Sequence, residues 1–135
     1  MDIPASNPVR ALVVDDGRMN RRLAERMLKR LNCEVFIAEG MDEAAEILRH
    51  EPLDIVFSDI EMPGIDGAEV APQLRSLART FSPERGHLRL VAVSGDGLGS
   101  DPEAYRTVGF DDYVPKPISF DSLKTQLDAI ANPMD

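Results

Sequence analysis

The feature of this sequence that most constrains its fold is a set of five short apolar runs spaced along the chain. The runs are largely continuous and rich in β-branched residues, which is typical of strands covered on both faces of a parallel sheet. They occupy residues 11–14, 35–38, 55–57, 88–93 and 113–114. We therefore predict a strand at each of these positions.

Amphipathic helical patterns lie between these runs. The first has an apolar residue at every fourth position, widened by two more apolar side chains, and this stripe is expected to face the core. Its members are Met19, Leu23, Met27 and Leu31, with Ala24 and Leu28 beside them. The other patterns lie within residues 40–48, 66–78, 101–108 and 119–130. Asp101 and Ser119 are predicted caps of the last two helices, and Gly109 is predicted to end the former. Pro72 should shift the start of its helix or kink it.

The alternation of strand and helix predicts an α/β fold, with a doubly wound five-stranded parallel sheet and helices on both of its faces. The chain has 135 residues, which is the size of a single domain. We expect this domain to span residues 9–131, with flexible tails at residues 1–8 and 132–135.

Composition and charge narrow the classes of function. The net charge of −9 disfavours nonspecific binding to nucleic acid or to an anionic membrane. Cys33 is the single cysteine, so no internal disulfide forms, and the spacing of the two histidines does not suit a zinc site. No apolar run approaches the length of a membrane span, and the first residues lack the pattern of a signal peptide. We expect a cytoplasmic protein without nucleic-acid or membrane contact.

Polar side chains stand where four of the predicted strands end. Asp15 and Asp16 follow the first strand, and Asp59 follows the third. Ser94 ends the fourth, and Lys116 follows the fifth. Because parallel strands carry their carboxyl ends at one edge of the sheet, these side chains are expected to converge. For any one aspartate alone, a turn or helix-cap role is the simpler interpretation; the whole set favours a functional site.

Three carboxylates at one edge would repel one another and raise each other's pKa unless a cation lay between them. Hard oxygen ligands without a nearby histidine or cysteine suit Mg²⁺, which is often shared with a phosphate. The sequence therefore predicts a Mg²⁺ site that includes Asp15, Asp16 and Asp59.

These residues resemble the receiver domain of two-component response regulators, and in detail the receivers of hybrid histidine kinases. The segments that carry the resemblance are Val13–Asp16, Asp59–Gly67, Val93–Gly95, Gly109–Tyr113 and Lys116–Pro117. It covers residues 9–131, and it implies a flavodoxin-like sheet with the strand order 2-1-3-4-5. That order puts the last strand at an edge, where Pro115 is tolerated.

The resemblance implies that Asp59 is a phosphoacceptor that takes a phosphoryl group from a phosphohistidine. It implies that Asp16, Asp59 and the backbone carbonyl of Glu61 ligate Mg²⁺, with Asp15 acting mostly through a metal-bound water. The phosphodonor would be a sensor histidine kinase or a histidine phosphotransfer protein. Such a chain is a signalling protein that catalyses only its own phosphoryl transfer and dephosphorylation.

Three further positions acquire roles from the resemblance. Lys116 would pair with a phosphoryl oxygen and, before phosphorylation, with Asp59. The Ser94 hydroxyl would bond another phosphoryl oxygen. Tyr113 would be an aromatic switch that swings inward and changes the surface of the fourth helix, fifth strand and fifth helix, although partly buried packing would also explain this ring.

Two other functions stay open. One is a receiver-shaped adaptor that is not phosphorylated. The other is an Asp-nucleophile phosphohydrolase, which the position of Asp59 after the third strand disfavours. The first helix is also strongly basic for an acidic chain, with Arg18, Arg21, Arg22, Arg26, Lys29 and Arg30 against Glu25. These side chains form either a solvated helix surface or a docking face for an acidic phosphotransfer partner.

Overall fold

The computed structural model describes residues 8–83, 87–95, 99 and 101–131. Most of the two predicted tails, residues 1–7 and 132–135, lies outside this part of the chain. The described residues form one parallel sheet with the strand order β2-β1-β3-β4-β5. Its strands are β1 (Arg10–Val14), β2 (Glu34–Ala38), β3 (Ile55–Asp59), β4 (Arg89–Ser94) and β5 (Asp112–Pro115). The predicted sheet and its strand order are confirmed.

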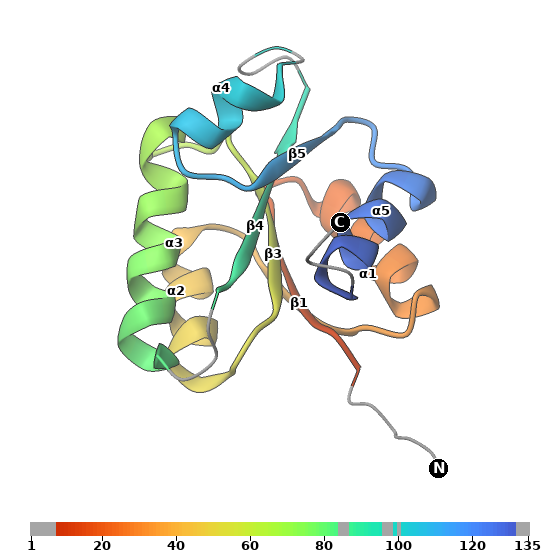
Figure 1. Ribbon diagram of the computed structural model, residues 1–135, viewed down its shortest axis with the longest axis horizontal. Helices are drawn as coiled ribbons and strands as arrows, with labels where there is room; N and C mark the ends of the chain where they lie inside the picture. The colour runs from red at the N-terminus through yellow and green to blue at the C-terminus, as the bar shows by residue number, and fades with distance from the viewer. Residues whose placement is uncertain (1–7, 84–86, 96–98, 100, 132–135) are drawn as a thin grey trace.

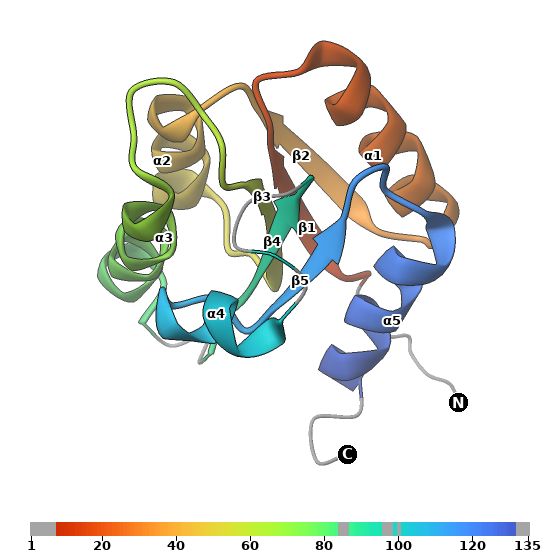
Figure 2. The ribbon, with the colours of Figure 1, turned by 90° about the horizontal axis from the view of Figure 1, so that it is seen from above.

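Five helices in the same residues cover the two faces of the sheet. They are α1 (Arg18–Arg30), α2 (Met41–His50), α3 (Gly67–Phe81), α4 (Pro102–Thr107) and α5 (Phe120–Ala131). Figure 1 shows α1 and α5 on one face and α2 and α3 on the other. Figure 2 shows from above that α4 lies on the side of α3. The doubly wound arrangement is therefore as predicted.

The core consists of two apolar layers that share the sheet. Successive residues of β1 point to opposite faces, so Leu12 and Val14 belong to the layer under α2, α3 and α4. Ala11 and Val13 belong to the layer under α1 and α5. All four side chains are at most 2% exposed. Burial on both faces explains the apolar sequences of β1, β3 and β4, whereas the edge strands β2 and β5 are only partly buried, contrary to the expectation from their sequences.

Local hydrogen bonds fix where the helices begin. The Asp101 carboxylate accepts from the Glu103 backbone N–H at 3.0 Å, which confirms the predicted cap of α4. The Ser119 hydroxyl oxygen accepts from the Ser122 N–H at 3.1 Å and caps α5. Gly109 follows α4 with a φ of +106°, a conformation that favours glycine.

Two details of the helices differ from the predictions. Met19 is 84% exposed and Leu23 is 42% exposed, whereas the buried residues of α1 are Ala24 and Leu28. A spacing of four residues drifts around a helix with 3.6 residues per turn, so the stripe leaves the core towards the N-terminus of α1. Of the two effects expected of Pro72, a shifted start is not seen, because α3 begins at Gly67 with Pro72 inside it; the kink stays a prediction.

Pro115 pairs in register with Ser94 and lies in the edge strand β5, as expected for a proline in a sheet. In the part of the chain that the structure describes, no helix has both the length and the apolar character needed to span a membrane.

Candidate functional site

The five polar residues predicted to converge do so at the carboxyl ends of the strands. Asp59 is the last residue of β3 and Ser94 the last of β4, while Asp15 and Asp16 follow β1 and Lys116 follows β5. One carboxylate oxygen from each aspartate lies within 4.8 Å of those of the other two. The Lys116 Nζ lies 3.2 Å from the Asp59 Oδ2. We call this group the acidic cup.

Asp59 is the most constrained carboxylate of the cup. It is only 2% exposed. Its Oδ1 accepts a hydrogen bond from the Glu61 backbone N–H at 2.9 Å, and its Oδ2 accepts from Lys116. The Lys116 backbone N–H in turn donates to the Ser94 carbonyl at 2.9 Å. The ladder between β4 and β5 therefore holds the lysine beside the aspartate.

The other two carboxylates differ in their surroundings. Asp15 is buried, and its Oδ1 accepts from the Gly17 N–H at 2.7 Å. Burial raises the pKa of the Asp15 carboxyl, and the charges of Asp59 and Asp16 add to this effect, against the Gly17 bond and the Lys116 charge, which lower it. Asp16 is exposed at the rim of the cup. A buried carboxylate that is costly to ionise, grouped with two others, fits a site for a hard cation.

Ser94, the last residue of β4, carries a hydroxyl group that makes no hydrogen bond to the described residues. Its residue is 2% exposed, and its Oγ is the only buried side-chain oxygen or nitrogen without a hydrogen-bond partner in the described residues. Buried polar groups are normally paired, and an exception needs an explanation. A ligand oxygen entering the cup is one group that would satisfy it.

Tyr113 lies in β5 three residues before Lys116, and its ring is partly buried. It stacks on the ring of Tyr105 from α4, with ring centroids 4.4 Å apart and an angle of 11° between their planes. Tyr105 is fully buried, and its hydroxyl donates to the Gly99 carbonyl at 2.7 Å. Tyr105 could not be identified from the sequence, because nothing in its local pattern separates it from an ordinary core residue of a short helix.

The basic side chains of α1 do not form one uniform surface. Arg21 belongs neither to a solvated helix surface nor to a docking face, because its guanidinium donates to the Asp15 carbonyl at 2.7 Å and lies 4.0 Å from the Glu39 carboxylate. Its side chain is only 11% exposed. Arg21 therefore supports the segment that carries the cup.

The remaining basic residues of α1 divide into two groups. Lys29 pairs with Glu25 at 3.2 Å, and Arg30 lies over the Phe120 ring of α5. The other three, Arg18, Arg22 and Arg26, are exposed, and the ion pairs that α1 makes within the described residues are those of Arg21 and Lys29. We call these three arginines, together with exposed Met19 and Leu23, the basic face.

A doubly wound sheet whose carboxyl edge holds three aspartates, a serine and a lysine defines a class of signalling domain. The family model of the response regulator receiver domain matches residues 11–128. This chain therefore belongs to the response regulator receiver domain family, as its resemblance in sequence implied.

Individual relatives agree with this assignment. The chain is 35% identical over 129 residues to the two-component response regulator ORR41 of Oryza sativa, covering 88% of this chain and 91% of the relative. It is 30% identical over 131 residues to stress response regulator protein 1 of Debaryomyces hansenii, covering 94% of this chain. The alignment includes 52% of that relative, so the chain spans about half its length.

A solved structure of similar fold contains a receiver in complex with another protein. It is the receiver domain of Saccharomyces cerevisiae Ssk1, co-crystallised with the histidine phosphotransfer protein Ypd1. The likeness has a TM-score of 0.71 at 22% identity, and it covers 88% of this chain and 86% of the other. At this identity the comparison concerns the fold alone.

Proposed function

We propose that this chain is the phosphoacceptor of a two-component phosphorelay and that Asp59 receives the phosphoryl group. The observation that carries the proposal is the 3.2 Å contact between Lys116 and Asp59 inside a cluster of three aspartates. Lys116 is 57 residues from Asp59 in sequence, so only the fold explains the contact. An ion pair needed for stability alone would not require two more carboxylates beside it.

Phosphoryl transfer needs a nucleophile, a fixed geometry and positive charge around the transferring group. An Asp59 carboxylate oxygen attacks the phosphorus of a phosphohistidine, the P–N bond breaks, and the electron pair stays with the imidazole, which takes up a proton. The product is an acyl phosphate on Asp59. Attack of water on the phosphorus later breaks the P–O bond to the carboxyl group and restores the carboxylate with release of inorganic phosphate.

The residues of the cup fit Mg²⁺. Asp16, Asp59 and the backbone carbonyl of Glu61 would hold it directly, and buried Asp15 would act mostly through a bound water. When bound, Mg²⁺ neutralises charge on the transferring phosphoryl group. Lys116 contributes a further positive charge and would leave the Asp59 carboxylate to bind a phosphoryl oxygen.

Two residues connect phosphorylation to the surface of the protein. The unpaired hydroxyl of Ser94 would donate to a phosphoryl oxygen. Tyr113 would change position in response and alter the surface formed by α4, β5 and α5. Phosphorylation then shifts the balance between two conformations of the domain.

The phosphodonor we propose is a sensor histidine kinase or a histidine phosphotransfer protein. The Ssk1 receiver of similar fold was crystallised with a phosphotransfer protein. In this chain, the basic face of α1 begins next to the cup, because α1 starts at Arg18, two residues after Asp16. A donor with an acidic surface would dock there.

The test is the intact mass of the protein after incubation with Mg²⁺ and acetyl phosphate. The wild type is expected to gain one phosphoryl group, and Asp59→Asn is expected to gain none. Asp66→Asn is a matched control, because it makes the same change in charge after the same strand, and asparagine caps a helix as well as aspartate does. Chelation of Mg²⁺ should abolish the adduct.

A wild-type protein that stays unmodified while folded would favour a receiver-like adaptor instead. If the adduct persists in Asp59→Asn but disappears in another aspartate variant, Asp59 is not the phosphoacceptor.

A further inference from the structure

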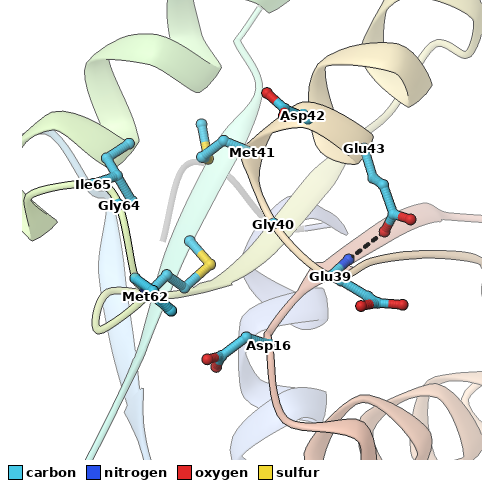
Figure 3. Close-up of a pocket in the computed structure, with 10 residues that line it drawn as sticks. Asp16, Glu39, Gly40, Met41, Asp42, Glu43, Met62, Gly64 and Ile65 are labelled. Carbon is cyan, nitrogen blue, oxygen red and sulfur yellow. Dashed lines mark hydrogen bonds between the residues drawn. The ribbon is translucent and has the colours of Figure 1, made fainter.

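A hollow of about 470 Å³ lies beside the acidic cup, on the side of the sheet that carries α2 and α3. Figure 3 shows its walls, which come from the segment joining β2 to α2 and from the segment after β3. Its floor is apolar, with Met41, Met62 and Ile65. Met62 is buried at 7% exposure, and the other two pack against the same core layer.

The rim of the hollow is acidic. It carries four carboxylates, which are Asp16, Glu39, Asp42 and Glu43. The Glu43 carboxylate accepts a hydrogen bond from the Glu39 backbone N–H at 2.5 Å, which holds it at the rim (Figure 3). Among the described residues, no lysine or arginine lines the hollow, and Arg21 approaches Glu39 from α1 only to 4.0 Å. The Glu39 side chain stays 70% exposed.

The hollow continues along the helices. A second hollow of about 340 Å³ shares Met41 and Asp42 with the first and extends between α2 and α3 over Ala45 and Leu77. The two together form what we call the acidic groove: an elongated depression with carboxylates at one end and an apolar floor.

The carboxylates and the apolar floor of the groove together indicate which kind of molecule would bind there. A simple cation would use the carboxylates but not the apolar floor, and an apolar side chain would leave the carboxylates unpaired. Lysine and arginine carry an apolar stem and a cationic end, so they satisfy both. Methionine adapts its shape to irregular partners, which suits a peptide surface. A nucleic acid or an acidic peptide would be repelled.

We propose that the acidic groove binds a peptide segment of a partner protein in which lysine or arginine residues flank apolar residues. The segment lays its apolar side chains and basic stems on Met41, Met62 and Ile65, and its cationic ends meet Glu39 and Glu43. This binding uses residues outside the proposed phosphoryl-transfer chemistry except Asp16, and it does not require Asp59 to be phosphorylated.

Gly40 offers a way to close the groove. It lines the first hollow, a Cβ added to it would meet no atom within 4 Å, and its φ of −170° is open to any residue. Gly40→Leu therefore adds a large apolar side chain at a residue that lines the hollow, and its Cβ has room. Gly40→Ser is the matched control, since it adds little volume and suits the cap position of α2.

The experiment measures the affinity of the unphosphorylated protein for a fluorescent synthetic peptide of lysine, arginine and leucine, with Mg²⁺ at saturation. Saturating Mg²⁺ keeps the peptide from reporting on the cup. The double variant Glu39→Lys, Glu43→Lys is expected to weaken binding by about tenfold or more. Gly40→Leu is expected to weaken it by a similar factor, and Gly40→Ser by less than about twofold.

A control variant separates the groove from the overall charge. Asp121→Lys with Asp128→Lys on α5 makes the same change in net charge on the opposite face, and it should retain the affinity within about twofold. Equal weakening by this control, equal competition by the polyamine spermine, or unchanged affinity in Gly40→Leu would each overturn the proposal. Circular dichroism verifies that the variants are folded, and the acetyl phosphate reaction reports separately on Asp59.

Discussion

The basic face of α1 and the acidic groove beside α2 lie on opposite sides of the same rim, and they carry opposite charge. The basic face presents Arg18, Arg22 and Arg26 around exposed Met19, whereas the groove surrounds its apolar floor with carboxylates. The net charge of −9 hides this division. One proposed phosphorylation site is thus flanked by surfaces of opposite charge, which would select different partners because charges at the rim of an interface steer encounters.

The largest expected effect separates the exposed from the buried residues of α1. Leu28→Ala should lower the free energy of unfolding by about 3 kcal/mol, since Leu28 is fully buried. Met19→Ala should change it by less than about 0.5 kcal/mol, because Met19 is 84% exposed. Urea denaturation measures both. Leu74→Ala, in the core under α3, should match Leu28→Ala; a large effect of Met19→Ala would show that the basic face is not free.

A charge reversal on the basic face should slow phosphotransfer selectively. Arg18→Glu with Arg22→Glu is expected to slow transfer from a phosphorylated protein donor by about tenfold at low salt, because electrostatic steering is lost. Transfer from acetyl phosphate should be unchanged. Time courses of Asp59 phosphorylation with the two donors provide the comparison.

Two arginines on the other side of the sheet supply the control for that reversal. Arg49→Glu with Arg79→Glu alters the charge equally at the far ends of α2 and α3 and should leave both rates unchanged. Equal slowing with both donors in Arg18→Glu, Arg22→Glu would reject docking on α1 and indicate damage to the cup.

The smallest expected effect concerns the Asp111 carboxylate, which accepts a hydrogen bond from Arg75 of α3 on the same side of the sheet as the acidic groove. Burial acts to raise the pKa of the Asp111 carboxyl, but the Leu90 N–H, His87 and Arg75 together lower the pKa below its ordinary value of 3.8. The ionised Asp111 carboxylate therefore stabilises the fold fully above pH 3.8, and this stabilisation is lost as the pH falls through the lowered pKa of Asp111. Asp111→Asn should cost about 1 to 2 kcal/mol at neutral pH.

Urea denaturation at a series of pH values measures this difference for Asp111. The gap between the wild type and Asp111→Asn should narrow in acid, where the wild-type carboxylate is protonated as well. A gap that does not change with pH would mean that the charge of Asp111 is not what anchors Arg75 of α3.

Much of the fold could be predicted because local signals and the global architecture agree. The apolar runs, the caps at Asp101 and Ser119 and the proline of the edge strand each specify their element directly. The strand order came from the family resemblance, since a strand sequence does not identify its neighbour. The expected core-facing stripe of α1 is wrong at Met19 and Leu23, because residues spaced by four drift around a helix with 3.6 residues per turn and leave the side that faces the core.

The residues of the cup could be predicted because each stands at the end of a recognisable strand. Their distances and the unpaired hydroxyl of Ser94 required the structure. The stacked ring of Tyr105 and the role of Arg21 depend on tertiary neighbours and leave no local pattern. The acidic groove is built from separate segments, so its carboxylates do not form a charged run in the sequence as the arginines of α1 do.

The proline in β5 also has a consequence for assembly. The Lys116 N–H points to β4, and backbone N–H groups alternate along a strand, so the N–H that Pro115 lacks is one that would face outward. A sheet edge that lacks one backbone N–H donor pairs poorly with a further strand. We expect a protein that binds at the β5 edge to contact side chains and not to add a strand. Strand pairing between copies of this chain would use the other edge of the sheet, at β2.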